Sequence, residues 1–105
     1  MGDETTLQVN RNDRAQRYEL SNDGDLVGAA AYHDRDGRRT FTHTAVDDER
    51  EGEGLGSTLA RAALDDTRAQ GKAVVPICSF IAGWIDRHVE YGDLVDREML
   101  DRIAG

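Results

Sequence analysis

The stretch from Arg39 to Cys78 constrains the fold most, because it combines two strand patterns with a helix between them. Residues 39–46 alternate as a strand does, and the apolar run 73–78 is typical of a buried strand. Residues 56–70 place apolar side chains at helical spacing, and Gly71 follows as a natural C-terminal cap. This order of elements favours a right-handed crossover between two parallel strands.

Pro76 limits the pairing of the second strand. Proline has no N–H group, so it cannot donate a hydrogen bond to a neighbouring strand. We therefore expect the pairing to fail near the end of residues 73–78, which would leave a gap where the two parallel strands part.

The N-terminal half predicts an antiparallel meander. The extended pattern begins at Leu7, and strands are expected over residues 16–21, 26–33 and 39–46. Tight turns at residues 22–25 and 34–37 would join them, because both contain residues that tolerate positive φ. In the last strand, alternation predicts one face with Phe41, His43 and Ala45, and the other with Thr42, Thr44 and Val46.

Two further helices are expected after the crossover. Ser79 can cap the first of them, and a last short helix would begin at Asp96. The chain of 105 residues therefore predicts one domain over residues 1–105, with residues 1–6 frayed. Its fold class is α+β: an antiparallel meander, a β-α-β crossover with splayed parallel strands, and C-terminal helices.

Composition narrows the class of protein. No apolar run approaches the ~18 residues that span a bilayer, and the acidic N-terminus is unlike a secretory signal, so we expect a soluble cytoplasmic protein with no membrane partner. The single cysteine, Cys78, excludes an internal disulfide and a cysteine-cluster metal site. The three histidines show no ligand spacing, so no metal is expected.

The net charge of −8 disfavours a nucleic-acid partner and favours a cationic one. Acidic residues number 21 against 13 basic ones, and Lys72 is the only lysine. An aspartate-rich, lysine-poor surface of this kind is typical of proteins adapted to high salt. A specifically acidic binding surface is the alternative.

Residues 46–57 form a glycine-rich loop that opens into the helical pattern. Alternate glycines ahead of a helix let backbone N–H groups approach a phosphate closely. The segment nevertheless carries five carboxylates and a single arginine. A P-loop would need lysine after the last glycine, where Ser57 stands, and a dinucleotide fingerprint would need a third glycine at that position. The remaining interpretation is that residues 46–57 are only a flexible connection between the strand and the helix.

The spacing Glu51-x-x-Gly54-x-Gly56 resembles the acetyl-CoA loop of the GNAT superfamily of N-acetyltransferases. The resemblance covers roughly residues 15 to 95 and extends to three further segments: His43-Thr44-x-Val46, Val75-Pro76-Ile77-Cys78-Ser79-Phe80 and His88-Val89-Glu90-Tyr91. Together these segments resemble the small, single-domain GNAT-like family. The chain departs from the usual pattern at Glu51 and Glu53, where basic or neutral residues are common, and at Val89, where proline is common.

The resemblance implies a minimal GNAT acyl-CoA N-acyltransferase fold that uses acetyl-CoA. It implies that the pyrophosphate of coenzyme A lies on the backbone of the loop and that the pantetheine arm lies in the strand split. The cofactor-binding residues would be Val46, Glu51, Gly52, Glu53, Gly54, Leu55, Gly56 and Ser57. The acceptor would be an amine, either a small molecule or a protein lysine or N-terminal amine.

Cys78 and His43 are the candidate catalytic residues. Cys78 precedes the expected cap of a helix, whose N-terminus would lower a thiol pKa from its usual ~8.5. It could accept the acetyl group transiently, line the pocket, or be a small core residue. His43 could be the general base, since an amine must lose its proton before attack, or a strand histidine tied to a neighbour.

Two mechanisms and one rival function follow. Direct attack of the amine on the thioester, with a backbone N–H stabilising the oxyanion, is the simpler route, and transfer through Cys78 is the alternative. The resemblance implies that Tyr91 protonates the departing thiolate. The rival is a non-catalytic acyl-CoA-binding or interaction module on the same fold.

Overall fold

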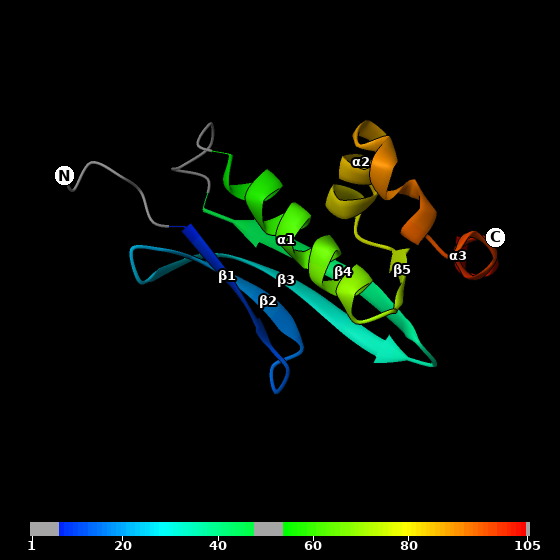
Figure 1. Cartoon of the computed structure of the whole chain (residues 1–105), viewed down its shortest axis with the longest axis horizontal. Helices are drawn as coiled ribbons and strands as arrows, with labels where there is room; N and C mark the ends of the chain where they lie inside the picture. The colour runs from blue at the N-terminus through cyan, green and yellow to red at the C-terminus, as the bar shows by residue number, and fades with distance from the viewer. Residues whose placement is uncertain (1–6, 48–53, 105) are drawn as a thin grey trace.

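The computed structural model describes residues 7–47 and 54–104, which form one mixed sheet and the helices packed on it (Figure 1). The sheet contains β1 (Leu7–Asn12), β2 (Arg17–Asn22), β3 (Asp25–Arg35), β4 (Arg38–Val46) and β5 (Ala73–Pro76), in that spatial order. Neighbours from β1 to β4 are antiparallel, whereas β5 lies parallel to β4. The predicted α+β class, with its meander and parallel crossover, is confirmed, and β1 adds a fourth antiparallel strand to the three that were expected.

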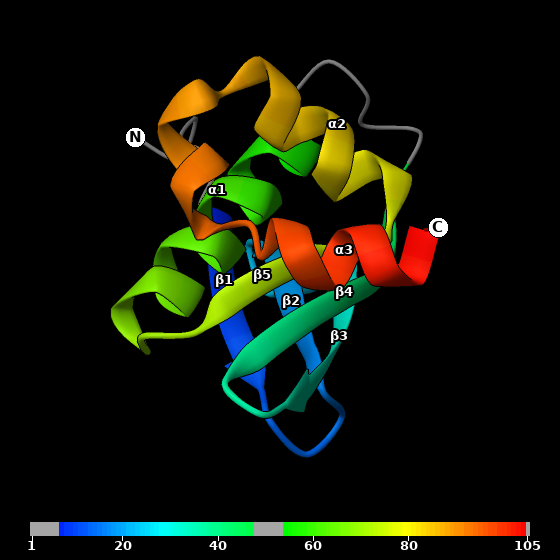
Figure 2. The ribbon, with the colours of Figure 1, turned by 90° about the vertical axis from the view of Figure 1, so that its right-hand side faces the viewer.

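The helices follow β4 and β5 in the chain. They are α1 (Leu55–Ala69), α2 (Ser79–Arg87), the 3₁₀ helix η2 (Val89–Leu94) and α3 (Arg97–Ala104). The α1 helix lies across one face of the sheet, and α2 lies next to it (Figures 1 and 2). Within the described residues, no helix is long and apolar enough to cross a membrane.

The core lies between the sheet and α1. Fully buried side chains from both layers meet there, among them Leu20, Phe41, Leu59 and Leu64. The two predicted hairpin turns are present: Asp23 and Gly24 in one, and Asp36 and Gly37 in the other, all have positive φ. Such turns match the twist of the strands, so they set the register of the meander.

The ends of the helices follow from local hydrogen bonds. At the end of α1, Gly71 has φ 71° and Lys72 N donates to Thr67 O at 3.2 Å, as in a Schellman motif. Asp96 caps α3, since its Oδ1 accepts from Met99 N at 3.0 Å. The expectation for α2 was wrong by one residue. Its N-cap is Cys78, whose backbone is extended, and Ser79 is the first helical residue.

The predicted faces of β4 need correction. Tyr32 pairs with Phe41 and Ala31 with His43, so Thr42 is an extra residue opposite β3, as in a β-bulge. Ala30 is fully buried and pairs with Thr44, which places Thr44 and Phe41 on the face toward α1. His43 therefore lies on the outer face of the sheet, and the grouping with Phe41 was wrong.

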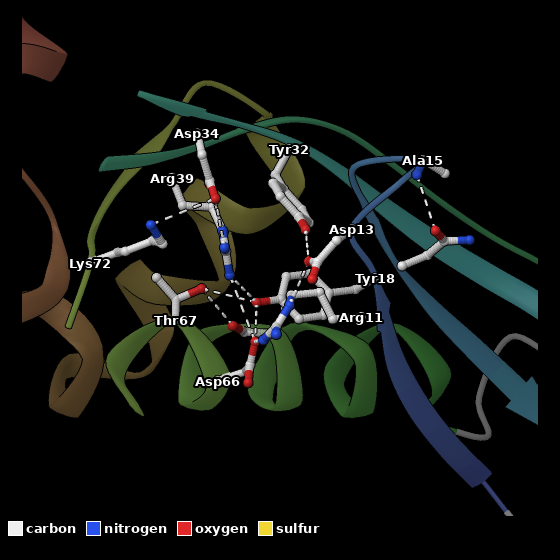
Figure 3. A network of polar contacts seen from close by, with 12 residues as sticks. Arg11, Asp13, Ala15, Tyr18, Tyr32, Asp34, Arg39, Asp66, Thr67 and Lys72 are labelled. Atoms are coloured by element: carbon white, nitrogen blue, oxygen red, sulfur yellow. Dashed lines mark hydrogen bonds and ion pairs between the residues drawn. The ribbon is translucent and has the colours of Figure 1, made fainter. Parts of the chain in front are cut away.

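A buried arginine joins the sheet to α1 (Figure 3). The Arg39 side chain is 2% exposed, and its Nε and Nη2 each donate to Asp34 at 2.7 Å. Its Cζ lies 4.3 Å from the centroid of the Tyr32 ring, a cation–π geometry. Nη1 donates to the hydroxyl of Tyr18, which in turn donates to Asp66 of α1 at 2.6 Å.

The charges of this network shift the pKa values of its members. The hydrogen bonds from Arg39 hold the pKa of Asp34 below its usual value. Burial alone would raise the pKa of Asp66, but hydrogen bonds from Tyr18 and Arg11 outweigh it, and the net shift is downward. Burial raises the pKa of Tyr18 to about 12. Both carboxylates are therefore held in the charged form that Arg39 and Arg11 require.

We expect Arg39→Ala to lower the free energy of unfolding by about 3 kcal/mol, because it removes a buried cation and leaves its partners unpaired. Urea denaturation would measure the loss. Arg35→Ala is the matched control, because Arg35 is 82% exposed and its variant should change stability by less than about 0.5 kcal/mol. Equal effects of the two variants would contradict a special role for Arg39.

Candidate coenzyme site at the strand split

The two parallel strands part after a single short stretch of pairing. Phe41 and Pro76 form the last pair of β4 with β5, and residues 42–46 of β4 continue beyond it. The carbonyl of Phe41 accepts from both Ile77 N at 3.1 Å and Cys78 N at 2.9 Å, as the chain turns from β5 into α2. The gap predicted from Pro76 is therefore present at the carboxyl ends of the strands.

A cavity of about 420 Å³ lies between the end of β4, the N-terminus of α1 and one face of α2. It is lined by Val46, Asp47, Gly54, Leu55, Gly56, Ser57, Phe80, Trp84, Arg87 and His88. Five of the predicted binding residues are thus brought together: Val46, Gly54, Leu55, Gly56 and Ser57. The others, Glu51, Gly52 and Glu53, lie outside the described residues.

The first turn of α1 directs backbone donors at this cavity. Gly54 has φ 75°, and its carbonyl accepts the helical bond from Thr58 N at 2.9 Å. The N–H groups of Leu55, Gly56 and Ser57 precede that bond and have no intrahelical acceptor. Together with the helix dipole they favour an anion at this wall.

Gly56 packs closely against a side chain of α2. A Cβ at this position would lie 2.6 Å from Cζ of Phe80, closer than real contacts allow. The absence of a side chain at Gly56 therefore lets the Phe80 ring of α2 approach the first turn of α1. A second contact fixes the same junction, since Trp84 Nε1 donates to Ser57 Oγ at 3.0 Å.

The last turn of α2 forms the opposite wall. The rings of Trp84 and His88 stack with centroids 3.7 Å apart and planes 11° apart. His88 Nδ1 lies 2.7 Å from the carbonyl oxygen of Trp84, which can only accept, so Nδ1 carries the hydrogen. The Nε2 atom is the nitrogen left for a ligand. The sequence alone does not assign a binding role to this wall, because the helical spacing of Phe80, Trp84 and His88 is typical of a stripe that packs on the core.

Cys78 lies at the mouth of the split. Its side chain is buried, and its Sγ donates to Thr44 Oγ1 across the gap at 3.3 Å. Cys78 does not line the described cavity itself. The structure thus places the thiol beside β4, on the side of the sheet that carries α1.

The other predicted chemical groups lie apart from the cavity. His43 is exposed on the outer face of β4, one residue beyond the bulge. Tyr91 is buried against α1, where its hydroxyl donates to Asp65 at 2.7 Å and receives a bond from Arg61 at 3.3 Å. Burial and the bond to Asp65 raise the pKa of Tyr91. The residues described here therefore do not bring Cys78, His43 and Tyr91 into one cluster.

Comparison with known proteins identifies the family. A model of the GCN5-related N-acetyltransferases matches residues 17–94, and the chain belongs to that family of acyltransferases. Comparison with curated protein sequences finds no significant match.

Solved structures share the fold. A GCN5-like protein from Staphylococcus aureus, solved by NMR, is 21% identical with a TM-score of 0.67, and the match covers 90% of each chain. The ribosomal-protein-S18-alanine N-acetyltransferase from Escherichia coli is 19% identical with a TM-score of 0.54 over 72% of this chain. The match spans only 43% of that enzyme.

We expect Gly56→Ala to reduce stability by about 1 kcal/mol, because the new methyl group would displace Phe80. In a Phe80→Ala background the same change should instead be neutral or stabilising, since alanine is the better helix former. Thermal unfolding of the four proteins in this double-mutant cycle would measure the coupling. Additive effects would contradict the contact between the two residues.

Proposed function

We propose that the protein is an acetyl-CoA-dependent N-acetyltransferase that acetylates a primary amine. The observation that carries the proposal is the cavity at the strand split, where the first N–H groups of α1, which have no acceptor within the helix, meet the parted ends of β4 and β5. Membership of the GCN5-related family supports the same reaction class. Ligands of such β-α-β units bind beyond the carboxyl ends of parallel strands.

The residues present fit coenzyme A. The N–H groups of Leu55, Gly56 and Ser57 would bind its pyrophosphate, and Val46 would contact the pantetheine arm where that arm enters the split. Bound acetyl-CoA would supply an activated acetyl group as a thioester. Phosphate affinity comes from backbone groups here, because lysine is absent from this turn and a helix N-terminus favours anions without one.

The protein itself would contribute a backbone donor for the reacting carbonyl oxygen and a side chain that accepts the proton of the amine. Residues 42–46 of β4 have backbone groups that β5 does not pair, so an N–H there can stabilise a developing oxyanion. We assign the amine proton to His43, which would act on an acceptor approaching from the outer face of the sheet. Direct transfer of this kind needs no covalent intermediate on the protein.

The acceptor class follows from charge. With a net charge of −8 the protein attracts cationic amines, whether polyamines or basic protein segments. The related E. coli enzyme is named for acetylating an alanine of a ribosomal protein. A protein N-terminal amine is therefore among the acceptors to test.

Incubation with labelled acetyl-CoA and a panel of polyamines, lysine peptides and free N-terminal peptides tests the proposal. We expect label to pass to at least one amine class at a rate above the uncatalysed reaction. Tight binding of acetyl-CoA without transfer to any amine, including those of a cell extract, would instead support the non-catalytic acyl-CoA-binding module.

We expect Cys78→Ala to retain kcat within about threefold, because direct transfer leaves the thiol only a packing role beside Thr44. Cys78→Ser is the matched variant that keeps a hydrogen-bonding group. Steady-state kinetics with the acceptor found above would measure both. A loss of about a hundredfold or more in both variants, with acetyl-CoA binding intact, would establish the covalent route through Cys78.

A further inference from the structure

We propose that Arg87, in the last turn of α2, binds the 3′-phosphate of coenzyme A, so that the site discriminates coenzyme A from dephospho-coenzyme A. This inference rests on the proposed function, because it assigns one more group of the same ligand. It concerns the cavity wall opposite the N–H groups of α1.

Arg87 differs from most of the described arginines, because no carboxylate in the described part of the chain pairs with it. Ion pairs with carboxylates are formed by Arg11, Arg17, Arg35, Arg38, Arg39, Arg68 and Arg102. Within residues 7–47 and 54–102, no carboxylate pairs with Arg87, although the chain has 21 acidic residues. Of the arginines in that part of the chain, Arg87 is the one that lines the cavity.

The guanidinium lies along the helix instead of extending away from it. A Cβ built on Gly83, one turn earlier in α2, would stand 3.5 Å from Nη1 of Arg87. Helical side chains lean toward the N-terminus in this way, so the charge lies back toward the turns that carry Phe80 and Trp84. Those two residues also line the cavity, and the charge is therefore available to an anion inside it.

The two walls offer two separate positions for anions. The first turn of α1 presents backbone N–H groups, which suit the pyrophosphate. The last turn of α2 has the opposite polarity, because helix carbonyls point outward at a C-terminus, and an anion there needs a cation beside it. Arg87 supplies this charge in a planar fork that matches phosphate oxygens, and His88 and Asp47 are the other titratable residues that line the cavity.

The chemistry of coenzyme A matches this arrangement. It carries a pyrophosphate and, across one ribose, a separate 3′-phosphate. When the pyrophosphate lies on α1, the 3′-phosphate is the remaining anion for the wall formed by α2. Dephospho-coenzyme A has the same pyrophosphate and lacks that group, so the two ligands separate the contributions of the two walls.

Calorimetric titration of coenzyme A and dephospho-coenzyme A at one fixed ionic strength tests the inference. For the wild type we expect coenzyme A to bind about tenfold more tightly, as for a charge-assisted contact. Arg87→Gln should weaken coenzyme A by about tenfold and leave dephospho-coenzyme A unchanged. Arg97→Gln is the matched control, because it makes the same change of charge at an exposed position of α3 outside the cavity lining.

Each other outcome overturns the inference in a distinguishable way. An equal loss for both ligands would place Arg87 on the pyrophosphate, and no loss for either would leave it without a phosphate role. The same loss in Arg97→Gln would reduce the effect to net charge. If wild-type protein binds neither ligand, the proposed function fails together with this inference, whereas binding without discrimination overturns this inference alone.

Discussion

The buried guanidinium of Arg39 is the interaction on which the arrangement of the sheet and α1 depends. A cation that is 2% exposed must be paired, and its partners come from several elements. The guanidinium donates to Asp34 on β3 and to the hydroxyl of Tyr18 on β2. That hydroxyl donates in turn to Asp66 on α1. Satisfying one charge therefore fixes the sheet against the C-terminal half of α1. The helix is a rigid rod, so its N-terminal turn is also directed, toward the split more than two turns away.

The split itself arises from backbone constraints on both strands. On β5, Pro76 is the last paired residue, and the following N–H groups converge on the carbonyl of Phe41 as the chain leaves the sheet. On β4, the bulge at Thr42 rotates the remaining residues, so that Thr44 faces Cys78 and His43 faces outward. The candidate site consequently has two sides: the cavity under α1 and α2, where the coenzyme is proposed to bind, and an outer side that carries His43. A direct-transfer enzyme needs this separation, because two substrates must reach one bond.

Local chemistry explains which parts of this structure the sequence could predict. Positive-φ turn residues fix the hairpins, helical spacing fixes α1, and the missing N–H of Pro76 fixes the gap. Each of these signals acts within a few residues of its effect. The bulge at Thr42 could not be predicted, because it depends on the register between β3 and β4. The burial of Arg39 was missed for the same reason, since Tyr18 and Asp66, which enclose it with Asp34, are distant in sequence. Likewise, the apolar residues of α2 divide between the core, which takes Ile81 and Ile85, and the cavity, which Phe80 lines, only once α1 packs beside the helix.

The charge of the protein can be reconciled with an anionic ligand. A net charge of −8 opposes coenzyme A at long range, but this repulsion is screened over about 8 Å at physiological salt. Contacts inside the cavity act at much shorter distances, where the N–H groups of α1 and the guanidinium of Arg87 favour an anion and the carboxylate of Asp47, which also lines the cavity, opposes it. Most other described arginines form ion pairs with carboxylates. The net charge of the surface therefore does not determine the charges that line the candidate coenzyme site. The net negative charge can then attract a cationic acceptor, while the proposed affinity for the coenzyme would come from one helix terminus and one arginine on the facing helix.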